Sequence, residues 1–254
     1  MQAKSELKQK VSVLELLKIL TFKSLPIIRN LAIAAVILAM AKPSITERNV
    51  VTEYYGVDIV VALDISTSML ADDFSPDRLS YAKSVVKDFI ELRQSDKMAL
   101  VLFAGESFAA TPLTLDKQAL FASLGIAQTG EITDGTAIGM GISSGLNLLK
   151  NSKAKSKMII LLTDGANNAG MVSPEDATGI AKELGVKIYT IGIGSENLSG
   201  SRTTQASADT KLNEPSLTNI ASVTGGKYYR ASSSGSLSQI MKEIDSNEKT
   251  LTKE

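Results

Sequence analysis

Residues 57–68 read Val-Asp-Ile-Val-Val-Ala-Leu-Asp-Ile-Ser-Thr-Ser, an apolar run that ends abruptly in Asp-x-Ser-x-Ser. The spacing of two lets an extended loop turn a carboxylate and two hydroxyls, from Asp64, Ser66 and Ser68, toward one point. Hard cations such as Mg²⁺ prefer shells of about six oxygens. Because ligands of open α/β sheets bind beyond the carboxyl ends of the strands, this stretch predicts a buried strand that leads into a divalent-metal site.

Two later segments supply further oxygen donors. Asp134-Gly135-Thr136 opens a helical pattern and offers the Thr136 hydroxyl, which is also placed to cap that helix. Residues 158–165 read Met-Ile-Ile-Leu-Leu-Thr-Asp-Gly, a second apolar run that ends in a carboxylate. The predicted metal ligands are Asp64, Ser66, Ser68, Thr136 and Asp164.

This order of residues closely resembles the metal-ion-dependent adhesion site (MIDAS) of von Willebrand factor type A (VWA) domains. That motif is Asp-x-Ser-x-Ser, then a distant Thr, then a distant Asp. Over roughly residues 31–250 the chain also resembles the Bat (aerotolerance) branch of bacterial membrane proteins with this domain. The segments that carry the second resemblance are Phe103–Gly105, Thr111–Asp116, Asp134–Gly139, Tyr189–Gly194 and Thr224–Ala231.

The resemblance implies how such a site works. It would hold Mg²⁺ or Mn²⁺, and an acidic side chain of a partner protein would complete the metal shell. The context would be aerotolerance or envelope stress, and the partners would be other membrane or periplasmic proteins, including related VWA proteins.

Composition excludes several classes of function. The 254 residues contain no histidine and no cysteine, which rules out a Ser-His-Asp triad, a His-ligated zinc and thiolate metal sites. The formal net charge is zero, and no basic stripe with interleaved aromatic residues is present, which argues against a nucleic-acid partner.

From residue 51 to 250, apolar strand patterns alternate with helical patterns. This alternation predicts an α/β fold, and with the resemblance we expect a Rossmann-like, doubly wound, mostly parallel six-stranded sheet with one antiparallel edge strand. The expected strands are 57–63, 97–103, 107–110, 157–162, 186–191 and 227–229. The expected helices are 78–93, 116–124, 136–150, 174–184, 214–222 and 237–244.

Residues 1–50 are expected to form a separate helical anchor segment. The uncharged run Leu31–Ala41 is shorter than the ~17–25 residues that span a bilayer, so a buried or interfacial helix is one interpretation. The family resemblance favours the other, a membrane helix preceded by the amphipathic stretch Val11–Leu20. Because basic residues gather before the run, the positive-inside rule places the domain on the periplasmic side of the inner membrane.

Three functions fit these patterns, and a metal-dependent interaction module that is not an enzyme fits best. A Mg²⁺-dependent phosphatase with Asp64 as nucleophile would need a second Asp two residues later, where Ser66 stands. A regulatory subunit of an ATPase or metal-insertion complex is the third alternative. The chain has no Walker motif, so the ATPase would be a separate chain.

Overall fold

The chain forms two compact units, Met1–Thr52 and Glu53–Glu254. The computed structural model describes residues 18, 22, 24–37, 39, 56–194 and 213–251. In the first unit residues 24–37 are helical. Across the described residues, every helix is too short or too polar to cross a membrane. Apart from Lys18, the predicted amphipathic stretch Val11–Leu20 lies outside the described residues, and the predicted 1–50 anchor stays a prediction.

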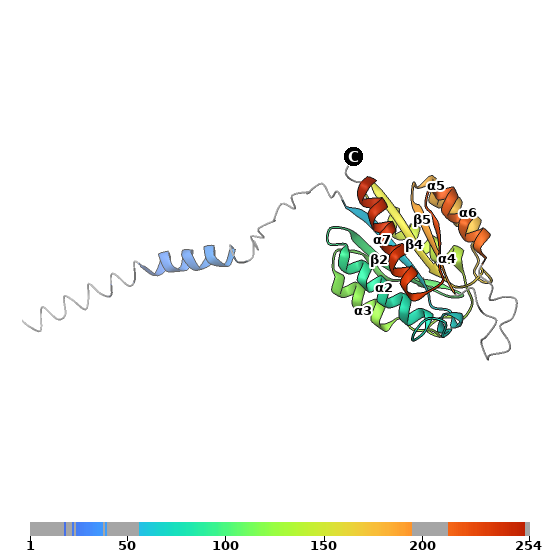
Figure 1. The fold of residues 1–254 in the computed structure, drawn as a ribbon. Helices are drawn as coiled ribbons and strands as arrows, with labels where there is room; N and C mark the ends of the chain where they lie inside the picture. Colours follow the sequence, from blue (N-terminus) through green and yellow to red (C-terminus); the bar gives the residue numbers. More distant parts are fainter. Residues whose placement is uncertain are drawn as a thin grey trace, which may run out of the picture. The chain divides into compact units, whose positions relative to one another are not determined.

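The second unit is built on a six-stranded sheet in the order β3-β2-β1-β4-β5-β6 (Figure 1). All neighbouring strands pair in parallel except β2 and β3, which are antiparallel, so the predicted fold class is confirmed. The strands are β1 (Val57–Asp64), β2 (Lys97–Phe103), β3 (Ser107–Thr114), β4 (Ser156–Thr163), β5 (Lys187–Ile193) and β6 (Tyr228–Ala231).

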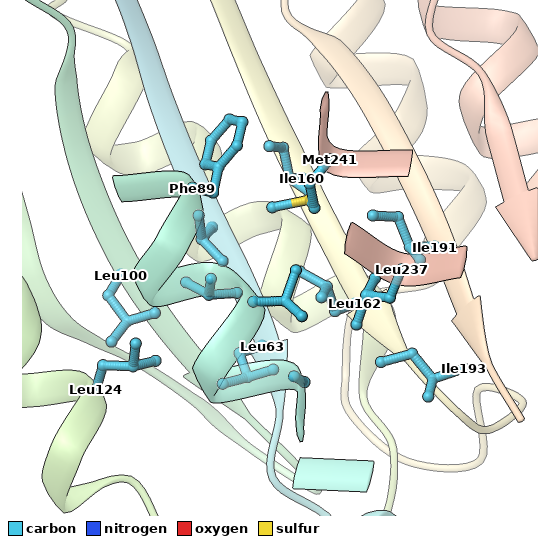
Figure 2. Packing of buried hydrophobic residues seen from close by; sticks show 14 of the residues in the cluster. Leu63, Phe89, Leu100, Leu124, Ile160, Leu162, Ile191, Ile193, Leu237 and Met241 are labelled. Atoms are coloured by element: carbon cyan, nitrogen blue, oxygen red, sulfur yellow. The ribbon is translucent and has the colours of Figure 1, made fainter. Parts of the chain in front are cut away.

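Helices cover both faces of this sheet (Figure 1). The helices are α2 (Arg78–Leu92), α3 (Lys117–Ile126), α4 (Ile138–Leu149), α5 (Pro174–Glu183), α6 (Glu214–Thr224) and α7 (Ser234–Leu251). Helices α2, α3 and α7 pack on one face, where Phe89, Leu124 and Met241 meet Leu63 and Ile160 of the sheet (Figure 2). Helices α4, α5 and α6 bury the other face. Both faces are covered, which explains why β1 is buried along its whole length.

Most element boundaries lie within about two residues of their predicted positions, and the exceptions are α7, which spans Ser234–Leu251 where 237–244 was predicted, and β3. Strand β3 continues to Thr114, so the predicted end at Ala110 was wrong. The strand runs through Pro112, which an edge strand tolerates because the missing N–H faces no neighbour. The pairing of β3 with β2 is irregular on both sides of Leu100.

Helix α4 packs unusually close to its neighbours because glycines line its buried side. A Cβ on Gly139 would lie 2.1 Å from the Val172 carbonyl oxygen, and one on Gly141 would lie 2.9 Å from the Phe103 ring. Neither position has room for a larger side chain, so glycine is required for this packing. The contact at Gly139 joins the start of α4, directly after Thr136, to the loop that follows β4.

This close packing predicts opposite effects for two Gly→Ala changes. Gly139→Ala should lower the free energy of unfolding by about 1–3 kcal/mol, because the added methyl overlaps backbone. Gly179→Ala in α5 has no atom within 4 Å of the added carbon and should raise stability by about 0.5–1 kcal/mol. Urea denaturation of both variants measures the two values. Shifts of the same sign would contradict the packing of α4.

Candidate metal centre

The five predicted ligands meet at the carboxyl edge of the sheet. Asp64 ends β1 and Asp164 follows β4, and these strands are neighbours that run in parallel. Ser66 and Ser68 lie in the loop after β1, with their hydroxyl oxygens 3.1 Å apart. Ser68 donates a hydrogen bond of 2.6 Å to Asp164 Oδ1. A Cβ on Gly165 would lie 3.2 Å from Thr136 Oγ1, so the Thr136 hydroxyl faces the same turn.

Asp64 is completely buried, and both of its carboxylate oxygens accept hydrogen bonds. The backbone N–H of Ser66 donates to Oδ1 at 2.9 Å, and the Thr163 hydroxyl donates to Oδ2 at 2.6 Å. Sequence reasoning did not single out Thr163, although a hydroxyl at the end of the adjacent strand was a visible signal. These two bonds fix the orientation of the Asp64 carboxylate before any ligand arrives.

Asp164 is held by a buried arginine that the sequence did not identify. Arg78, in the first turn of α2, donates to Asp164 Oδ2 at 2.8 Å. Its other nitrogens form a two-pronged ion pair with Asp73, both bonds at 2.7 Å. The helix is capped by Asp77, whose carboxylate accepts from Ser80 N at 2.7 Å and so fixes the turn that carries Arg78.

The Thr136 hydroxyl is not used to cap helix α4. Ala137 occupies the N-cap position without a side-chain hydrogen bond, so the expected capping role of Thr136 was wrong. Asn168 Oδ1 accepts from the Thr136 N–H at 2.7 Å, and Asn167 Oδ1 accepts from the Ile138 N–H at 2.8 Å. Two asparagines of the loop after β4 therefore accept hydrogen bonds from backbone N–H groups at the start of α4. The Thr136 hydroxyl stays available to a metal.

Asp134 ties the two ligand-bearing loops together. Its carboxylate accepts from the Thr67 N–H at 3.1 Å and from the Thr67 hydroxyl at 2.6 Å. Thr67 stands between Ser66 and Ser68 in the sequence. Asp134 therefore anchors the loop after β1 to the segment that presents Thr136.

The chemistry of this donor set fits a hard divalent cation. Burial, followed by the nearby Asp164 carboxylate, raises the pKa of Asp64 to about 7. Burial also raises the pKa of Asp164, against the opposing effects of Ser68 and Arg78. Two buried carboxylates that repel one another are stabilised by a cation between them. Within the described part of the chain no three His, Cys, Asp or Glu residues cluster, so the hydroxyls would have to supply the rest of the shell.

Comparison with known proteins identifies relatives of this domain. The family model of the von Willebrand factor type A domain matches residues 58–243. An aerotolerance-related membrane protein from Bacteroides fragilis has a TM-score of 0.64 and 28% identity, over 74% of this chain and 98% of that one. BatB from Bacteroides thetaiotaomicron has a TM-score of 0.66 and 30% identity, over 76% of this chain and all of that one.

A third structure bears on the metal. Proximal thread matrix protein 1 from the mussel byssus, with a zinc-occupied MIDAS motif, has a TM-score of 0.60 and 27% identity, over 74% of this chain and 44% of that one.

An uncharacterised protein from Borreliella burgdorferi is 34% identical over 207 residues, which cover 78% of this chain. The chain spans about three fifths of the length of that relative, 61%.

The raised pKa of Asp64 predicts a pH dependence of cation binding. A proton on Asp64 competes with the metal, so affinity should rise with pH up to about 7, by at most about tenfold per pH unit, and then level off. Calorimetry with Mg²⁺ or Mn²⁺ at several pH values between 5 and 8 measures this. An affinity that does not change below pH 7 would show that Asp64 is already ionised in the metal-free protein.

The role of Asp134 predicts an effect on the metal without direct contact. Asp134→Ala should weaken cation binding by about 10-fold, because it frees the loop that carries Ser66 and Ser68. The matched control is Glu131→Ala, since Glu131 is exposed on the same loop and forms no ion pair among the described residues. Isothermal titration of both variants measures the difference. A similar loss in the two would mean that only the local charge matters.

Proposed function

The chain belongs to the von Willebrand factor type A family, and we propose that it binds a divalent cation, Mg²⁺ or Mn²⁺, through Asp64, Ser66, Ser68, Thr136 and Asp164. The bound cation captures an acidic side chain of a partner protein. The observation that carries this proposal is the convergence of two buried carboxylates and three hydroxyls at one edge of the sheet.

The ligand set of the site favours an acidic partner. Only two of the five proposed ligands are charged, and Arg78 already offsets part of the charge of Asp164. Asp64 and Asp164 would do no more than neutralise a divalent cation, since Arg78 is itself paired with Asp73, and the neutral hydroxyl ligands would preserve its Lewis acidity. A carboxylate from outside then replaces bound water because it coordinates the cation directly, and this contact has to outweigh the negative charge of the surrounding loops.

The loops around the centre also offer apolar contacts to a protein. Leu70, two residues after Ser68, is 53% exposed, and Met171, in the loop after Asp164, is 95% exposed. Flexible methionine suits surfaces that adapt to a partner. A partner segment with an acidic residue flanked by apolar side chains would match this arrangement.

We favour an interaction module over an enzyme. Asp64 is the candidate nucleophile of a phosphatase-like alternative, but its side chain is fully buried and both oxygens are engaged by Ser66 and Thr163. A nucleophile must reach the reacting atom of its substrate. The same burial suits a metal ligand, which needs to reach only the cation.

The proposed setting is the inner membrane, with the domain facing the periplasm. The similarity to an aerotolerance-related membrane protein and the excess of basic residues before the run Leu31–Ala41 support it. The partners would then be other membrane or periplasmic proteins, among them related VWA proteins, and the context would be aerotolerance or envelope stress.

Removal of single ligands should separate the site from the fold. Asp64→Ala should abolish calorimetric binding of Mg²⁺ or Mn²⁺, and Thr136→Ala should weaken it by on the order of tenfold or more, with one-to-one stoichiometry in the wild type. Circular dichroism should stay unchanged, because the Thr136 hydroxyl caps no helix. Equal binding by all three proteins would refute the proposed ligands. Pulldowns with wild type and Asp64→Ala, with and without chelator, extend the test to the partner.

The proposed topology has a separate test. An alkaline-phosphatase fusion after residue 55 should be active, because the basic residues before Leu31 hold the N-terminus in the cytoplasm. Reversing the charge of Lys18, Lys23 and Arg29 should lower that activity. An inactive fusion, with protein that alkaline carbonate washes from membranes, would place the domain in the cytoplasm and leave the metal site untouched.

A further inference from the structure

We propose that the edge of the sheet opposite the metal centre is a docking surface for the anionic phospholipid headgroups of the membrane. This inference rests on the membrane attachment in the proposed function and goes beyond it. The surface, called the basic edge below, consists of the loops at the amino ends of the parallel strands and the loop between β3 and α3. It comprises residues 56–58, 93–97, 114–117, 150–157, 184–187 and 225–227.

Lysines mark the start of four of the five parallel strands. Lys97 and Lys187 are the first residues of β2 and β5, Lys157 is the second residue of β4, and Lys227 directly precedes β6. Lys97 and Lys157 are both level with Asp58 of β1, in the middle of the sheet. Because neighbouring strands lie about 4.8 Å apart, these strand starts form a row along the edge, with Lys97 and Lys157 beside Asp58 on one face of the sheet and Lys187 on the other.

The loop between α4 and β4 adds positive charge beside this row. Lys150, Lys153 and Lys155 are all exposed there. In total the basic edge contains eight lysines and one arginine against three carboxylates. Arg93 is paired with Asp96 and with Asp245 of α7, and Lys227 is paired with Glu243 of α7, so the excess comes mainly from the lysines at the starts of β2, β4 and β5 and in the loop between α4 and β4.

The metal edge has the opposite charge. The loops that build it, residues 64–78, 104–106, 131–136 and 164–173, contain eight carboxylates and one arginine. A chain whose formal net charge is zero therefore carries a domain with one negative and one positive edge. An anionic surface attracts the basic edge and repels the other, so it turns the metal centre away from itself.

Exposed leucines lie among the lysines of the basic edge and beside it. Leu92 ends α2 and is 52% exposed, Leu115 precedes α3 and is 51% exposed, and Leu184 follows α5 and is 37% exposed. Lys117 donates to the Glu91 carbonyl oxygen, which brings the loop that carries Leu115 to the end of α2. Apolar side chains between lysines suit the boundary between headgroups and acyl chains.

The route of the chain favours a membrane over any other polyanion. Strand β1 begins at the basic edge with Val57, whose N–H donates to Asp96 Oδ1 at 2.9 Å. Residues 42–55 link this point to the proposed anchor and can span at most roughly 50 Å. A tether of that length raises the local concentration of membrane lipid that the basic edge meets.

Residues 56–251 can be tested alone, since the Bacteroides structures consist of this domain and match over 98% and all of their length. The domain should sediment with phosphatidylcholine vesicles that contain about one third phosphatidylglycerol and not with phosphatidylcholine alone, and salt should weaken this binding. Lys150→Gln/Lys153→Gln should reduce binding by roughly thirtyfold, because each lysine near an anionic surface contributes roughly fivefold. The control Lys87→Gln/Lys242→Gln changes exposed lysines of α2 and α7 and should reduce it less than about twofold.

Three results would overturn the proposal. The domain could bind neutral vesicles as well as anionic ones, or the two double variants could lose binding equally. It could also bind duplex DNA more tightly than anionic vesicles. Circular dichroism of both variants checks that the fold is intact. Mn²⁺ calorimetry on the same preparations separates the two claims. Normal metal binding without vesicle binding would refute only the membrane-docking role of the basic edge. Vesicle binding without metal binding would refute only the proposed metal ligands.

Discussion

Two carboxylates, Asp64 and Asp164, are buried at the ends of neighbouring parallel strands. Buried carboxylates need hydrogen-bond donors, and the residues around this site supply them. The two side chains are kept in place by Thr163 on one side and by Arg78 on the other. Burial without compensation would favour protonation, as the raised pKa of Asp64 indicates. A divalent cation between the two groups would remove this conflict, so the same residues that cost stability in its absence would create the affinity for it.

The fold was largely predictable because the four central strands, β1, β2, β4 and β5, are buried on both faces and therefore apolar along most of their length. The run from Val57 to Leu63 shows this clearly, and Asp64 directly after it marked the functional edge. The extension of β3 through Pro112 was not predictable, because the residue disfavours central strands and the position at the edge comes from the tertiary arrangement.

The proposed ligands were readable from a linear motif, whereas the groups that orient them were not. Arg78 lies in an ordinary amphipathic helix pattern, and only the packing of α2 brings it to Asp164. Asn167 and Asn168 cap a helix that precedes them in sequence, a contact that local capping rules cannot foresee. Supporting residues of this kind are set by three-dimensional contacts and have no fixed spacing.

The central claim is that one cation binds among Asp64, Ser66, Ser68, Thr136 and Asp164. Anomalous diffraction from crystals of the domain grown with Mn²⁺ tests it most directly, because it locates the metal independently of affinity. The account predicts one strong peak within coordination distance of the Ser66 and Ser68 hydroxyls, with an outside carboxylate or water at the exposed position. A peak elsewhere, or none at this edge of the sheet at saturating Mn²⁺, would contradict it.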